Sequence, residues 1–127
     1  MSFTNTHETH LLTYTFTATS VTRPTAWYIG LFTGAPGEAA GGTEISGNAY
    51  ARKVVAFTIS GNSATNTSAV EFTAASGGNW GVISHVAIFD ASTSGNMIAY
   101  SALSASKTIN DGDAFRIPAS NLTITLD

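Results

Sequence analysis

The sequence WGVISHVAIFD, from Trp80 to Asp90, has the β-branched and aromatic composition of a strand and carries apolar side chains on both faces. Simple alternation places Trp80, Val82, Val86 and Ile88 on one face and Ile83, Ala87 and Phe89 on the other. A strand with one face in water alternates apolar and polar residues, so this strand should be covered on both sides. A chain of 127 residues has few elements for that task. We therefore expect neighbouring copies or other proteins to complete its burial.

The composition predicts one domain, residues 1–127, in which hydroxyl and amide side chains replace charge. The chain has five basic and eight acidic residues, a net charge of −3 and no cysteine. No charged or proline-rich linker divides it, and its length suits a single core. The basic residues do not cluster as phosphate contacts require, which argues against nucleic-acid binding.

No apolar run approaches the ~18 residues that cross a bilayer, so membrane insertion is not expected. The N-terminus has neither the basic nor the apolar region of a secretory signal. Synthesis in the cytoplasm is the expectation that follows.

The N-terminal segment, residues 3–17, has two interpretations. Residues 12–19, LTYTFTAT, alternate as a strand would. Ser2 or Thr4 could instead cap a helix that has Glu8 in its opening turns. Four bulky residues support the helix by their spacing: Phe3, His7, Leu11 and Tyr14. We favour a short helix, and the strand is the alternative.

Residues 25–127 are expected to form an all-β, antiparallel sandwich of jelly-roll type, with seven or eight short strands separated by Gly, Asn and Ser turns. A small barrel is the alternative. The final segment, LTITLD, alternates cleanly and should have one wet face. The other expected strands are TAWYIGLFT (25–33), YARKVVAFTI (50–59), SAVEFT (68–73), WGVISHVAIFD (80–90), MIAYSALSA (97–105) and AFRIPA (114–119).

Residues 34–48, GAPGEAAGGTEISGN, are the longest stretch without periodicity. Their glycines and single proline predict a loop. Loops of about fifteen residues inside a domain are uncommon and tend to be functional or mobile. This loop is the best local candidate for a contact surface.

Two groups of residues that contain histidine could carry chemistry, and each has a simpler explanation. His7 and His10 could share a helix face and hold a metal, but they lack the four-residue spacing and the glutamate of a zinc protease. Ser84, His85 and Asp90 lie close in sequence. Adjacent strand residues point to opposite faces, so Ser84 meets the His85 ring only across a bulge. We expect packing roles for these residues.

Asp111 and Asp113, in NDGD, resemble part of a calcium loop without its downstream glutamate, and a tight turn explains them more simply. Asn66 and Asn121 begin glycosylation patterns, which we regard as accidental without an export signal. The sequence therefore predicts no catalytic, cofactor-binding or metal-binding residues.

The aromatic residues could stack on sugar rings or line a groove for a partner. Because they lie in expected strands, core packing is the simpler explanation. They are Trp27, Tyr28, Tyr50, Trp80 and Tyr100.

Several ordered segments resemble those of one family: TAWYIGLFT (25–33), GNAYARK (47–53), NWGVISHVAIFD (79–90), KTINDGD (107–113) and LTITLD (122–127). The chain is similar along essentially its whole length to small structural proteins of tailed bacteriophages, the tail fibre or Gp80-like minor tail proteins. This resemblance implies a β-sandwich virion component that is repeated around a symmetric particle and has no catalytic residues.

We therefore expect a non-enzymatic virion protein, made in the host cytoplasm, that belongs to the tail fibre or receptor-contacting apparatus. Its expected partners are copies of itself, with a trimer as one form, other virion proteins, and a host surface glycan or receptor. Two alternatives are a capsid decoration protein and a carbohydrate-binding module that uses Trp27, Trp80 and loop 34–48. A hydrolase is disfavoured because paired acids, bases and nucleophiles are few.

Overall fold

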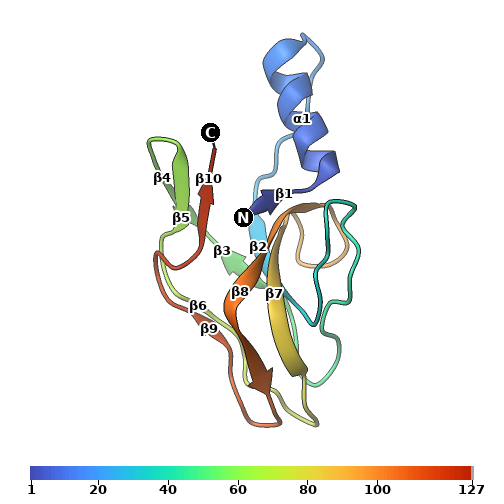
Figure 1. Cartoon of the computed structure of the whole chain (residues 1–127), viewed down its shortest axis with the longest axis vertical. Coiled ribbons are helices and arrows are strands. Elements are labelled where there is room, and N and C mark those ends of the chain that lie inside the picture. Colours follow the sequence, from blue (N-terminus) through green and yellow to red (C-terminus); the bar gives the residue numbers. More distant parts are fainter. Residues whose placement is uncertain (127) are drawn as a thin grey trace.

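A computed structural model describes residues 1–126, which form one helix and ten short strands in three antiparallel sheets (Figure 1). This architecture confirms the expected all-β class with a short N-terminal helix. Within residues 1–126, no helix is long and apolar enough to span a membrane. The elements are β1 (Ser2–Phe3), α1 (Asn5–Phe16), β2 (Trp27–Phe32), β3 (Lys53–Val55), β4 (Phe57–Ser60), β5 (Ser63–Asn66), β6 (Val70–Glu71), β7 (Gly81–Phe89), β8 (Met97–Ile109), β9 (Arg116–Ile117) and β10 (Thr123–Thr125).

The main sheet has the strand order β1-β8-β7-β2-β3, so β7 lies at its centre. Strand β2 pairs with β7 from Tyr28 opposite Phe89 to Phe32 opposite His85. A sheet of β10, β5 and β4 and the pair β6–β9 form the second layer. Residues of both layers share the main core, among them Ile29, Leu31, Val70, Ile83, Val86, Ile88, Ile117 and Leu122.

The pairing of β7 with β8 is irregular, because it passes from Ile83 opposite Lys107 to His85 opposite Ala102 and so leaves one residue of β7 opposite four residues of β8. The regular alternation of faces along a strand is broken at an irregularity of this kind. Ile83 therefore shares the main core with Val86 and Ile88 and is fully buried, whereas Val82 is 49% exposed. Simple alternation, which placed Val82 and not Ile83 on the face of Val86 and Ile88, was wrong at this point.

The other face of the main sheet carries a smaller apolar cluster of Phe32, Ala87, Phe89 and Met97, and the connection between β2 and β3 folds back over it. From residue 80 to residue 89, only Val82 is exposed. The expectation that other chains must complete the burial of this strand was therefore wrong. The chain covers both faces with its own residues.

An ion pair in this connection closes the second face. Arg52 donates from Nε and Nη2 to the two carboxylate oxygens of Glu44, each at 2.8 Å. Its Nη1 donates to the carbonyl oxygens of Ala91 and Ser94, at 3.0 and 2.8 Å. The guanidinium carbon lies 3.4 Å from the centroid of the Phe89 ring. One side chain thus joins two loops and lies over the cluster as a planar cap.

Tyr50 connects this ion pair to β2. Its hydroxyl donates to Glu44 at 2.6 Å and accepts the N–H of Leu31 at 3.0 Å. The N–H of Ile45 donates to the Leu31 carbonyl oxygen at 2.9 Å. Burial, followed by the hydrogen bond to Glu44, raises the pKa of the Tyr50 hydroxyl. The hydroxyl therefore stays protonated at neutral pH and remains a donor.

Helix α1 follows Thr4, which is fully buried. The Thr4 hydroxyl accepts the His7 N–H at 3.4 Å and donates to the Met97 carbonyl at 2.6 Å. These bonds cap the helix and tie its start to β8. The helix interpretation of residues 3–17 is confirmed over the strand. No residue of α1 is buried, and Figure 1 shows the helix extending away from the sheets.

Asn66 ties the second layer together. Its fully buried side chain donates from Nδ2 to the carbonyl oxygens of Ser68 and Pro118, both at 2.9 Å. Its Oδ1 accepts the Leu122 N–H at 2.9 Å. The glycosylation pattern that begins at Asn66 is therefore inaccessible in the folded chain.

Gly30→Ala should destabilise the protein by about 1–3 kcal/mol, since an overpacked side chain forces its neighbours to move. The added carbon would lie 2.9 Å from Glu44 Oε2 and 2.9 Å from Phe89 Cε2. Urea unfolding measures the loss. Gly34→Ala is the control, because a carbon added there would lie more than 4 Å from every atom outside its chain neighbours. It should change stability by less than ~0.5 kcal/mol. Equal effects of the two variants would contradict the close packing of the second face.

Asn66→Ala should cost at least about 2 kcal/mol, because it leaves the buried Leu122 N–H and two carbonyl groups without their partner. Asn121→Ala, at the exposed residue of the other glycosylation pattern, is the matched control. Denaturant titration of both variants checks the difference. A similar loss at both positions would show that the Asn66 network does not hold the layer.

Candidate functional site

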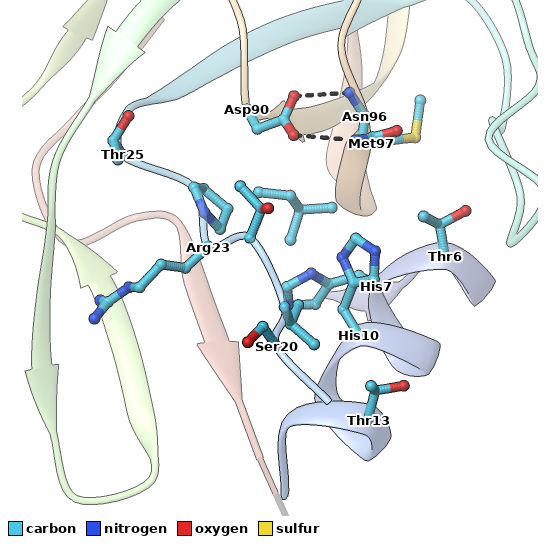
Figure 2. Close-up of a pocket in the computed structure, with 14 residues that line it drawn as sticks. Thr6, His7, His10, Thr13, Ser20, Arg23, Thr25, Asp90, Asn96 and Met97 are labelled. Carbon is cyan, nitrogen blue, oxygen red and sulfur yellow. Dashed lines mark hydrogen bonds between the residues drawn. The ribbon is translucent and has the colours of Figure 1, made fainter. Parts of the chain in front are cut away.

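A hollow of about 480 Å³, which we call the polar hollow, lies beside α1 (Figure 2). Its walls are one face of α1, the connector of residues 20–25 and the turn between β7 and β8. Its polar lining residues are Thr6, His7, His10, Thr13, Ser20, Thr22, Arg23, Thr25, Asp90 and Asn96.

Two histidines form the helix wall of the polar hollow. The rings of His7 and His10 meet edge to face with their centroids 6.4 Å apart, and His7 also packs on Phe3 at 5.1 Å. Figure 2 shows the two imidazoles close together between α1 and the connector. Burial, and then the nearby His10, lower the pKa of His7. His7 is therefore a neutral imidazole at pH 7.

The opposite wall is a closed turn. One carboxylate oxygen of Asp90 accepts the backbone N–H of Asn96 at 2.7 Å, and the other accepts its Nδ2 at 3.2 Å (dashed lines in Figure 2). The Arg23 side chain points away from the histidines in the same view. The walls thus offer hydroxyl, imidazole and amide groups, which suit hydrogen bonding to a polar ligand better than nucleophilic catalysis.

An apolar hollow of about 340 Å³ lies between β1, the connector and the β4–β5 hairpin. It shares His7, Pro24 and Trp27 with a hollow of about 350 Å³ between α1 and the connector. We call these two hollows together the apolar trough. Ile59 and Leu126 on its rim are 70% and 51% exposed. A surface of this kind is typical of a contact with another protein.

Charge is nearly absent from the apolar trough. Arg23 is the one Lys, Arg, Asp or Glu among the described residues that line it. Within residues 1–126, the two ion pairs are Glu44–Arg52 and Glu71–Arg116, so Arg23 has no partner there.

The structure places the residues singled out by sequence as follows. His7 and His10 do lie together, and no third His, Asp or Glu of residues 1–126 joins them to make a metal-binding group. Ser84 Oγ lies 2.8 Å from His85 Nδ1, at the point where the pairing of β7 with β8 is irregular. Asp90 is not part of that pair, because both of its oxygens bond to Asn96.

Asp111 and Asp113 lie in a hydrogen-bonded turn. The Asp113 carboxylate accepts the Asn110 N–H at 2.9 Å, and the Asp111 N–H donates to Asn79 Oδ1 at 2.8 Å. The Asp113 carboxylate and the Asp111 backbone N–H therefore both stabilise the turn.

The core explanation is confirmed for Trp80 and Tyr50. Trp80 is 6% exposed, donates from Nε1 to the Asn48 carbonyl at 2.9 Å and packs edge-on against Tyr50 and Phe72. Trp27 differs, because it lines the apolar trough and is half-buried. Of the two tryptophans, Trp27 is therefore the one that a ligand or partner can reach.

The loop predicted at residues 34–48 belongs to the longer connection between β2 and β3. It carries Glu44, which holds Arg52 over the second face of the sheet. This role of Glu44 was not predicted from the sequence. The outer side of α1, where Leu12 and Phe16 are 60% and 78% exposed, was not predicted either. Their four-residue spacing was a usable signal, but strand alternation obscured it.

Folding stability should fall as the pH drops below 6.5, the ordinary pKa of histidine, because the pKa of His7 is lowered in the folded state. Below pH 6.5 the histidine of the unfolded chain binds a proton more readily than folded His7 does. The contribution of His7 to folding stability is therefore fully present above pH 6.5 and is lost as the pH falls through the folded-state pKa. Urea unfolding between pH 7.5 and 5 measures this loss. His7→Gln should reduce the slope, and an unchanged slope would contradict the assignment.

Comparison with known proteins identifies one family. No curated protein matches this chain. A sequence model of one family, Gp80, described as podophage GP4 fiber I protein gp80, matches residues 2–125. The match covers both layers and the helix. The chain therefore belongs to the Gp80 family of podophage fibre proteins and is a bacteriophage structural protein.

Proposed function

We propose that the chain is a non-enzymatic module of a phage tail fibre, which assembles with copies of itself and with other virion proteins and contacts the host surface. The family match over residues 2–125 carries this proposal. The exposed apolar surfaces of α1 and the apolar trough support its assembly part.

The two ends of the molecule differ in surface chemistry, which supports a different role for each end. Figure 1 shows α1, the β4–β5 hairpin and β10 at one end, where most of the exposed large apolar residues lie. At the other end are the turns of residues 47–49, 76–79 and 110–113, which are rich in Asn, Asp and Gly. Hydrogen bonds from Asn48 to the Asn79 carbonyl and from the Asp111 N–H to Asn79 join these turns. The first end suits assembly, and the second suits contact with a polar host receptor or glycan.

Localisation in the virion tests the proposal. Phage particles should be purified that carry this chain with a short peptide tag inserted in the exposed turn after Asn110. Gold-labelled antibody against the tag should mark the tail fibres in electron micrographs. Untagged particles are the control for labelling.

Two outcomes would contradict the proposal. Label spread over the capsid would favour the decoration protein that was the alternative. Particles of normal infectivity that lack the chain altogether would show that it is not a required virion component.

A further inference from the structure

The outer side of α1 carries an apolar ridge. Glu8, Leu12 and Phe16 follow one another at four-residue spacing and so lie on one line along the helix. Leu12 and Phe16 are 60% and 78% exposed, and Glu8 is exposed as well. We call these three residues the ridge. Glu8 is the one Asp, Glu, Lys or Arg in α1.

Helix α1 lacks the packing that usually stabilises a helix of its length. Isolated helices shorter than about 12–15 residues are marginal in water. Here Thr4 fixes the start of the helix, but no helical residue is buried. Burial of the ridge against another surface would supply the missing stabilisation.

The apolar trough is the surface at the same end of the molecule that fits the ridge. The surface of its hollow beside the β4–β5 hairpin is mostly apolar, and Trp27, Ile59 and Leu126 contribute to it. Its one permanent charge, Arg23, is positive, and the one charge of the ridge, Glu8, is negative. Neither residue forms an ion pair within residues 1–126. The two surfaces therefore complement each other in both polarity and charge.

We propose that the ridge of one copy binds in the apolar trough of a second copy, with Leu12 and Phe16 on its apolar lining and Glu8 paired with Arg23. A second copy is the occupant because each chain carries both halves of a matching pair of surfaces. This inference rests on the proposed function and identifies the surface through which copies assemble.

Charge reversal tests the pairing. Analytical ultracentrifugation should show the full-length chain self-associating at micromolar concentration. Glu8→Arg alone or Arg23→Glu alone should weaken association roughly tenfold, as expected for a broken charge pair at an interface. The double variant should regain most of the affinity. Asp111→Arg, the same charge change at the other end of the molecule, is the control and should leave association unchanged.

Disulfide trapping tests the contact directly, because the chain has no cysteine of its own. A tagged Phe16→Cys copy mixed with an untagged Ile59→Cys copy should form a mixed dimer on mild oxidation. Phe16→Cys mixed with Val54→Cys is the control, since Val54 is 68% exposed but lies outside the apolar trough. Mixed dimers should form faster in the first mixture.

Three results would overturn the inference. These are a monomer at all concentrations tested, equal trapping rates in the two mixtures, and failure of the double charge reversal to restore association. A monomer whose ridge variants fail to enter virions would show that the ridge contacts another virion protein in place of a second copy. In each case, the gold labelling of particles would still decide the proposed function separately.

Discussion

The ion pair between Glu44 and Arg52 is the contact on which closure of the main sheet depends. The guanidinium of Arg52 uses all three of its nitrogen atoms, two on the carboxylate and one on two backbone carbonyls. Its side chain is 9% exposed, so the pair is largely removed from water and must be well matched to be stable. Stacking on Phe89 makes a charged group part of an apolar cover. This arrangement lets a small, weakly charged chain bury both faces of β7 without a partner.

Because the sheet is complete within one chain, assembly does not have to supply its core. The surfaces left for contact are those that do not take part in packing the sheets, namely the outer side of α1 and the apolar trough. This separation suits a repeated component of a particle. In the proposed assembly, each copy would fold first and then associate through a limited surface, without passing through an intermediate that exposes a hydrophobic sheet.

Composition and periodicity were sufficient for the all-β class, the short helix and the burial of Trp80, since each depends on local pattern. They were insufficient for β7, because no glycine or proline marks the irregular pairing at Ser84, beyond which the alternation of faces changes and Ile83 lies in the core. They could not reveal the cover of Phe89 either. Arg52 is remote from Phe89 in sequence and lies next to a segment without periodicity, so only the fold brings them together. The error about external burial follows from that omission.

Hydrogen exchange measured at several protein concentrations tests the account most directly. If the chain closes its own sheet, the amides of β7 should be equally protected in dilute and concentrated samples. The amides of α1 should gain protection only as concentration rises and copies associate. Protection of β7 that appears only at high concentration would contradict the account, since it would mean that neighbouring copies, and not Arg52 and its loop, cover the sheet.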